Sequence, residues 1–414
     1  SARYSRLSRM SVNTSSGNSR SGAAHMGAWL GVVTVVLTLV GWCSVPLFIR
    51  HFSHSIDVWT SNGWRYGFSA LLWAPVLVWG GLSARRRKLP PGLWRASIVP
   101  ALFNSLGQIA FAWSFYHVDP TTATFGLRLQ IVFVAIGAYL LFPSERRVLK
   151  SPQAWAAIAM VLIGISGTIF GSGQARKPDE VWGVVAAVAS GLLFASYGLG
   201  VRRFMHGFHP VTAFAAISQY TAIVMVVLML ALGHNVLDAA RPWDAGRSAL
   251  NLPAAQFGLL LLSSVIGIAL GHVFYYISIA RLGVAVSSGV IQIQPFGVAI
   301  GSYLLFDERL TPLQVVMGCV AVAGAVLLLF VQWSVSRKAR AEAAAVHGTP
   351  PLAAPGVHAL DDDVVISGAS ERSMEPGDLD AVPCEPAAPV GAAPGGVAEA
   401  GEPGAHPTRR SFDA

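Results

Sequence analysis

This 414-residue sequence has few charged residues, since only 12% of its residues are Asp, Glu, Lys or Arg. An average soluble domain has about 25%. Hydrophobic residues make up 53%, and apolar runs of about 20 residues, the length of helix that crosses a bilayer core, recur along the chain. The sequence therefore excludes an ordinary soluble globular protein and predicts a polytopic membrane protein.

Cysteine and intramembrane acid are also scarce. The three cysteines, Cys43, Cys319 and Cys384, have unrelated spacings, which excludes a disulfide framework or a thiolate metal site. The apolar runs contain no Asp or Glu, and no GxSxG, HExxH or Walker A motif is present. His54 and Asp57 lie in a loop where we expect no catalytic partner. These absences argue against an intramembrane enzyme and predict no metal and no cofactor.

The apolar runs define ten expected membrane spans. Only helices fit these lengths, because lipid offers no hydrogen-bond partner to an open backbone. The spans are 27–49, 59–82, 92–115, 121–142, 152–172, 181–200, 211–233, 253–279, 284–306 and 312–333.

Charge in the loops and tails predicts the orientation. Lys and Arg concentrate in loops on the same side as the N-terminus, including "RRRK" at 85–88, which the positive-inside rule places in the cytoplasm. Residues 1–26 are expected to be a flexible cytoplasmic segment and not a cleaved signal. Residues 341–414 contain 12 acidic and 3 basic residues and are rich in Ala, Pro and Gly, which predicts a disordered cytoplasmic tail. We expect a multi-pass protein of the cell (plasma or inner) membrane that contacts the lipid bilayer and binds no nucleic acid.

One apolar decapeptide occurs twice, as "FVAIGAYLLF" at 133–142 and "GVAIGSYLLF" at 297–306. The same offset aligns "LGQIAF" (106–111) with "LGHVFY" (270–275). Five spans separate the copies, and because five is odd, the second copy crosses the membrane in the opposite direction. The sequence therefore predicts an all-α fold of ten transmembrane helices in two inverted five-helix repeats, an arrangement that recurs in secondary transporters.

These features resemble the EamA-like branch of the drug/metabolite transporter superfamily, in which Tyr-Leu-Leu-Phe is followed by Glu-Arg at the ends of spans four and nine. The resemblance implies two halves, 27–172 and 181–333, around a cavity lined by helices three, four, eight and nine. It also implies export or exchange of small polar metabolites. The family often has a proline early in spans four and nine. Pro295 retains it and Ile131 replaces it in the first copy, which implies an asymmetric gate or cavity.

Two arginines lie inside expected spans, where a charged side chain is costly and usually faces protein or water. Arg128 lies about 10 Å from the outer end of span four at helical rise, and Arg65 lies at a similar depth in span two. Arg128 either extends to the outer interface or contacts an anionic or carboxylate-bearing substrate. Arg65 matches an arginine common in span two of the family and is expected to be a structural or gating anchor.

Polar side chains on spans three and eight are candidates for substrate binding. Asn104 and Gln108 share a face of span three because they are four residues apart. The repeat places His272 opposite Gln108, on a face that continues with Tyr275 and Tyr276. Hydrogen bonding between helices is the alternative role of these residues.

Span nine adds a further group of candidates. Gln292 and Gln294 lie next to Pro295, and a proline leaves a backbone carbonyl free for a ligand or a gate. Gln292 is the repeat equivalent of Arg128. This pairing predicts that the two halves hold different ends of one substrate.

The sequence thus predicts a secondary transporter that moves a small polar metabolite such as an amino acid, nucleoside, sugar or drug-like solute. Alternating access around a midplane cavity is the expected mechanism, in a monomer or homodimer. The alternative is a membrane scaffold, receptor or lipid translocator on the same bundle.

Overall fold

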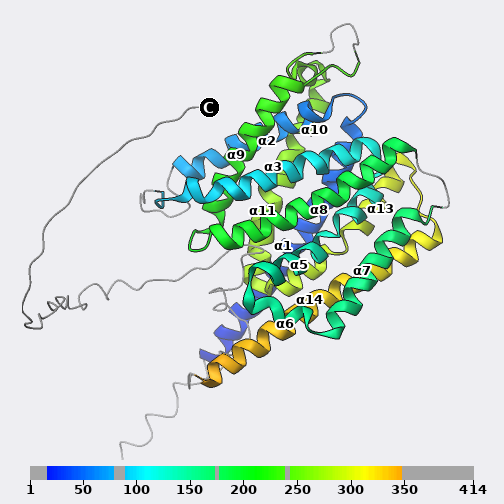
Figure 1. Cartoon of the computed structure of the whole chain (residues 1–414). Helices are drawn as coiled ribbons and strands as arrows, with labels where there is room; N and C mark the ends of the chain where they lie inside the picture. Colours follow the sequence, from blue (N-terminus) through cyan, green and yellow to red (C-terminus); the bar gives the residue numbers. More distant parts are fainter. Residues whose placement is uncertain (1–15, 79–88, 173–176, 238–242, 347–414) are drawn as a thin grey trace, which may run out of the picture. The chain divides into compact units, whose positions relative to one another are not determined.

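The computed structural model describes residues 16–78, 89–172, 177–237 and 243–346. This part of the chain is almost entirely helical, and Figure 1 shows the helices gathered in one bundle. The main helices are α1 (Ser16–Phe52), α2 (Val58–Val78), α3 (Leu93–His117), α4 (Pro120–Leu127), α5 (Gln130–Leu141), α7 (Pro152–Phe170), α8 (Pro178–Phe204), α9 (Pro210–Leu232), α10 (Ala254–Ser264), α11 (Gly271–Leu282), α12 (Val284–Ile291), α13 (Gln294–Phe306) and α14 (Pro312–Val346).

The lengths and apolar composition of the helices confirm the prediction of a polytopic membrane protein. Within the described residues, nine helical segments are long and apolar enough to cross a membrane. The second expected span is α2, which has 21 residues but includes Ser61, Asn62 and Arg65, so it is more polar than the other nine. These polar side chains are buried, which places them against other helices of the bundle.

Prolines define the starts of many helices. Helices α4, α7, α8, α9 and α14 each begin at a proline, where the missing N–H has no intrahelical partner to lose. Asp119 precedes the proline of α4 and caps that helix, accepting a hydrogen bond from the backbone N–H of Thr122 at 2.7 Å. The expected loops therefore lie where the sequence places proline and polar residues.

The ends of the bundle differ from expectation. Helix α1 begins at Ser16, although residues 1–26 were expected to be flexible, and α14 continues to Val346, although the tail was expected to begin at 341. Each residue added to an existing helix gains one backbone hydrogen bond, so both helices extend beyond their apolar cores. The loop at 85–88 and the tail from 347 onward lie outside the described residues.

Helix packing follows the predicted repeat. Helix α3 of the first half packs on α8 of the second, and correspondingly α11 packs on α1. In the same way α5 packs on α8 and α13 packs on α1. The helices α2 and α9, which are equivalent in the two halves, pack on each other, and so do α7 and α14 (Figure 1). The two halves therefore exchange equivalent contacts, as expected of inverted five-helix repeats.

Glycines allow α7 and α14 to approach closely. A Cβ at Gly164 would lie 2.4 Å from the backbone nitrogen of Ala321, and a Cβ at Gly324 would lie 2.8 Å from the backbone nitrogen of Val161. No side chain fits between backbones at this separation. The small residues of the last span in each half thus serve packing within the chain.

Spans four and nine are both interrupted at equivalent positions. Arg128 and Leu129 separate α4 from α5, and Gln292 and Ile293 separate α12 from α13. At both places the backbone forms a tighter turn, with a hydrogen bond to the residue three positions earlier. The N–H of Arg128 donates to the oxygen of Phe125, and the N–H of Gln292 donates to the oxygen of Gly289. Such tightening within a helix often marks a functional hinge. The first copy has the break without a proline, so the proline difference does not make these two spans unequal.

A different irregularity lies in span eight. Residues Val265–Leu270 form a π-helical stretch between α10 and α11, whereas the equivalent helix α3 is continuous. π-helical turns inside α-helices are frequent at functional sites. The backbones of spans three and eight therefore differ between the two halves.

Candidate functional site

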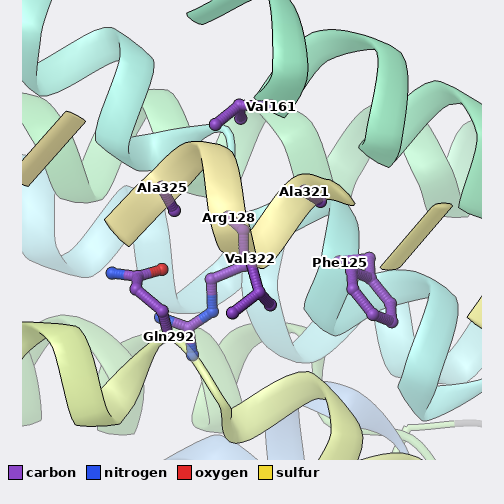
Figure 2. Close-up of a pocket in the computed structure, with 7 residues that line it drawn as sticks. All are labelled: Phe125, Arg128, Val161, Gln292, Ala321, Val322 and Ala325. Atoms are coloured by element: carbon purple, nitrogen blue, oxygen red, sulfur yellow. The ribbon is translucent and has the colours of Figure 1, made fainter. Parts of the chain in front are cut away.

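The two helix breaks bring Arg128 and Gln292 to one cavity. Arg128 ends α4 and Gln292 ends α12, and both side chains line a space between these helices, α7 and α14. Figure 2 shows the two side chains side by side, with Phe125 at the opposite end of the cavity. The remaining lining residues are Val161, Ala321, Val322 and Ala325. The cavity is thus apolar except at the two break residues.

This cavity is small in the described conformation. It leaves about 10 Å³ for the centre of a water-sized sphere, which is about the space that one water molecule needs. A metabolite does not fit there unless helices move. The space beside Arg128 and Gln292 is therefore too narrow for a metabolite in the described conformation.

The guanidinium of Arg128 points into the bundle. Its Nη2 donates a hydrogen bond to Oε1 of Gln294, which lies at the start of α13. Gln294 in turn donates from Nε2 to the backbone oxygen of Trp42 at 2.6 Å. This chain of hydrogen bonds joins span four to spans nine and one. In the described conformation Arg128 thus turns toward Gln294, and its contact with a substrate stays a prediction.

Two polar atoms at this cavity are buried without a partner. Neither Nε of Arg128 nor Oε1 of Gln292 forms a hydrogen bond with any described residue. An unsatisfied buried polar group costs about 1–3 kcal/mol, and more when it is charged. A ligand that supplies both an acceptor and a donor recovers this free energy. One donor with positive charge and one acceptor thus face the same cavity from the two halves.

Trp42, which was not predicted from the sequence, connects Gln294 to the predicted residues of span eight. Its ring lies 5.1 Å from that of Tyr275 and 5.5 Å from that of His272, centroid to centroid. Its indole N–H donates to the backbone oxygen of Gly267 in the π-helical stretch at 3.3 Å. A tryptophan in an apolar run looks like any core aromatic, so only its position in the fold reveals this role.

The predicted residues of span eight form an aromatic wall beside Trp42. His272 stacks on Phe214 of α9 at 4.3 Å, and its Nδ1 hydrogen-bonds the backbone oxygen of Ile268 at 2.9 Å. Tyr275 shares a hydrogen bond of 2.8 Å with the hydroxyl of Ser288. Tyr276 meets the edge of the Phe214 ring at 6.4 Å. Through Trp42 and Gln294, this wall is continuous with Arg128.

Asn104 connects α3 to α9. It donates a hydrogen bond to the hydroxyl of Thr221 on α9 at 2.9 Å, which is the interhelical contact that the sequence analysis considered as the alternative. Gln108, one turn further along α3, is half-buried.

Arg65 forms a contact between α2 and α10. Only 3% of the residue is exposed, and its Nε donates to the hydroxyl of Ser263 at 3.0 Å. Pro295 is buried in the first turn of α13. These contacts fit anchoring of the helices around the cavity.

Asp57 has partners that the sequence did not indicate. Its carboxylate accepts hydrogen bonds from the backbone of Trp59 and Thr60 and of His234, at 2.9, 3.1 and 3.2 Å. All three of these donors are backbone N–H groups, and that of His234 is available because the segment that follows α9 folds back onto Asp57. The residue caps α2. Among the described residues, no group of three His, Cys, Asp or Glu side chains is placed to hold a metal ion.

The fold and site define a class: a polytopic membrane transporter built from two repeated helical halves. The sequence pattern of the EamA-like transporter family matches this chain twice, over residues 29–170 and 181–330. The chain belongs to this family, within the drug/metabolite transporter superfamily, and its members are transporters and not enzymes.

The similarity to known proteins is illustrated by two relatives and one solved structure. A Synechocystis protein described as "Uncharacterized transporter sll1319" is 26% identical over 193 residues, or 44% of this chain and 57% of that protein. The chain therefore spans little more than half of that relative. A Streptantibioticus cattleyicolor protein described as "Probable terminal-alkyne amino-acid exporter" is 23% identical over 300 residues, or 72% of this chain and 92% of the relative. A protein crystal structure with 15% identity covers 73% of this chain and 97% of its own, with a TM-score of 0.47.

Proposed function

We propose that this transporter exports a small metabolite that carries a carboxylate and a neighbouring hydrogen-bond donor, as an α-amino acid does. The observation that carries the proposal is the pair of unsatisfied atoms, Nε of Arg128 and Oε1 of Gln292, at one cavity. A carboxylate accepts a charge-assisted hydrogen bond from Arg128, and an ammonium or hydroxyl group donates to Gln292. The relative described as an amino-acid exporter supports both this substrate class and the direction.

Alternating access is the proposed mechanism. The two breaks lie at equivalent positions of inverted halves, so rocking one half against the other exposes the same pair of residues to each side in turn. In the described conformation the cavity is lined by spans four, five, nine and ten. We propose that it extends toward spans three and eight when the halves move, so that Trp42 of span one and the aromatic side chains of span eight provide an apolar surface for the rest of the substrate. The closed cavity of the described structure fits an occluded intermediate.

The proposed orientation places both termini in the cytoplasm of the cell. It is supported by the concentration of Lys and Arg in loops on the side of the N-terminus. In this orientation Glu145 faces the cytoplasm and Glu308 faces the outside.

A flux assay in proteoliposomes tests the proposal. Purified protein is reconstituted, and exchange of a radiolabelled neutral α-amino acid is compared with that of its decarboxylated amine. We expect exchange of the amino acid and at least about tenfold less of the amine, since a charged hydrogen bond contributes about 1.5–3 kcal/mol. Equal exchange of both compounds contradicts the proposed site. Lipid scrambling without solute flux favours the alternative, a lipid translocator on the same bundle.

A further inference from the structure

Two ion pairs connect the halves of the bundle. Arg202 of α8 contacts Glu145, which follows α5, with 2.9 Å between Nη2 and Oε1. Arg50 of α1 contacts Glu308, which follows α13, with 3.8 Å between Nε and Oε1. In each pair the arginine comes from one half and the carboxylate from the other.

The two pairs are equivalent by the internal repeat. Glu145 and Glu308 both follow the copies of the repeated decapeptide. Arg50 lies 21 positions after residue 29 and Arg202 lies 21 positions after residue 181, the first residues of the two family matches. The helix contacts that bring them together, α13 with α1 and α5 with α8, are also equivalent.

The pairs lie at opposite faces of the membrane. Span one ends at Arg50, and eight further spans lead to Glu308, so these two residues share a face. Span four ends at Glu145 and span six ends at Arg202, so this pair shares the other face. Each pair thus closes one end of the bundle, one on either side of the breaks at Arg128 and Gln292.

The contacts at the two faces differ in strength. Arg202 also lies over the ring of Phe142, 4.2 Å from its centroid, and both partners of this pair are mostly buried. At the other face Arg50 also donates from Nη1 to the backbone oxygen of Phe115 at 3.5 Å, so its guanidinium is not used by Glu308 alone. Oε2 of Glu308 is buried without a hydrogen bond from any described residue. The Glu145 face is therefore held more firmly than the Glu308 face.

We propose that Arg202–Glu145 and Arg50–Glu308 are the two gates of the transporter, each of which must separate for its own face to open. Both gates are closed in the structure, in agreement with the small cavity between them. The longer contact makes the Glu308 face the one that opens more readily. The inference rests on the transport function proposed above, but its test requires no substrate, so its failure is distinguishable from an error in the proposed substrate.

The test measures access to the cavity from each side. Val322, which lines the cavity, is replaced by Cys in a full-length chain whose three native cysteines are replaced by Ser. A membrane-impermeant maleimide is added to sealed right-side-out and inside-out vesicles, and the labelling rate of Val322→Cys is recorded from each side. Arg202→Gln leaves Glu145 partly buried without its cation, and Arg50→Gln does the same to Glu308.

We expect each arginine variant to speed labelling from its own face alone by roughly two- to fivefold, the range of a partly exposed ion pair. The double variants Arg202→Gln/Glu145→Gln and Arg50→Gln/Glu308→Gln, which remove the unpaired carboxylate, return the rate toward that of the parent. This rescue separates a gate from general misfolding.

Exposed arginines provide matched controls. Arg203 is adjacent to Arg202 and exposed, and Arg309 forms an exposed pair with Asp307 beside Glu308. Their Gln variants are expected to label like the parent. The proposal is overturned if an arginine variant speeds labelling from both faces or neither, if the controls have the same effect, or if Val322→Cys reacts in no variant.

Discussion

Arg128 and Gln292 occupy the same position in the two halves of the chain, 164 residues apart in sequence, and face one cavity with one unsatisfied polar atom each. A positive donor therefore stands opposite a neutral acceptor across the internal repeat. This difference gives an otherwise symmetric site a direction, because a substrate with two unlike ends fits it in one orientation.

Removal of the charge at Arg128 tests its contact with a carboxylate. We expect Arg128→Gln to weaken the affinity for an α-amino acid by about 10- to 100-fold, since a charge-assisted hydrogen bond contributes about 1.5–3 kcal/mol. Exchange in proteoliposomes measures the change, and Arg203→Gln serves as the control. An unchanged preference between the amino acid and its decarboxylated amine contradicts this role.

Gln292 is expected to recognise the other end of the substrate. Gln292→Met keeps the size of the side chain and removes the acceptor, so affinity for an α-amino acid should fall by about 10- to 100-fold, because the ammonium donor makes this a charge-assisted hydrogen bond. Affinity for the corresponding carboxylic acid without an amino group should remain within about twofold. Competition of both compounds for exchange provides the measurement. Equal losses for the two compounds would show that Gln292 does not distinguish them.

Pro295 is not expected to be essential for the break in span nine. The first copy has Ile131 at the equivalent place and is broken all the same. We therefore expect Pro295→Ala to change the exchange rate by no more than about twofold and stability by about 1 kcal/mol or less, the scale of a tolerated Pro substitution. A loss of exchange comparable to that of Arg128→Gln would instead show that the proline itself is part of the hinge.

Close packing of α7 and α14 depends on Gly164. A Cβ there would lie within 2.6 Å of the backbone oxygen of Met317, so Gly164→Val forces the helices apart. We expect a loss of about 1–3 kcal/mol or more, typical of overpacking, measured as a lower thermal unfolding temperature in detergent. At Gly258, where an added Cβ meets nothing within 4 Å, Gly258→Ala should leave the temperature unchanged or slightly higher. Equal effects at both positions are incompatible with this explanation.

The Glu308 gate should respond to pH. Burial raises the pKa of the Glu308 carboxyl and the charge of Asp119 raises it further, while Ser302 and Arg50 act in the opposite direction. In an opened, hydrated face the pKa returns toward the ordinary value of about 4.3. Because the closed face has the higher pKa, proton binding favours closure, and the carboxylate formed at higher pH favours opening.

Labelling of Val322→Cys checks this sign. The rate from the Glu308 face, divided by that from the Glu145 face to remove the intrinsic pH dependence of the thiol, should fall as pH is lowered below the raised pKa. Glu308→Gln should abolish the dependence, whereas Asp307→Asn, at an exposed neighbour with positive φ, should retain it. A ratio that rises at low pH would reverse the assignment.

Hydropathy and the internal repeat are enough to predict the helical membrane fold and the two halves, and the resemblance of the Tyr-Leu-Leu-Phe and Glu-Arg motifs predicts the family. Apolar runs of this length form helices in lipid, because no other open backbone structure satisfies its hydrogen bonds there. The two copies of the decapeptide are five spans apart, and because five is odd, the second copy is inverted relative to the first. The repeat by itself also pairs Arg128 with Gln292. Hydropathy is a property of each helix by itself, and the pairing follows from aligning the two copies of the repeat, so both can be obtained from the sequence without knowing how the helices pack.

The contacts of the site are decided only by the tertiary structure. The sequence does not determine whether Arg128 reaches the interface or turns inward, since this depends on Gln294 and Trp42, which come from helices far apart in the chain. In the same way the sequence places a Glu-Arg pair after spans four and nine, with Glu145 and Glu308, but does not identify the arginines that pair with these carboxylates. Which helices meet is set by packing of the whole bundle, and a buried charge acquires its role from the partners that this packing supplies.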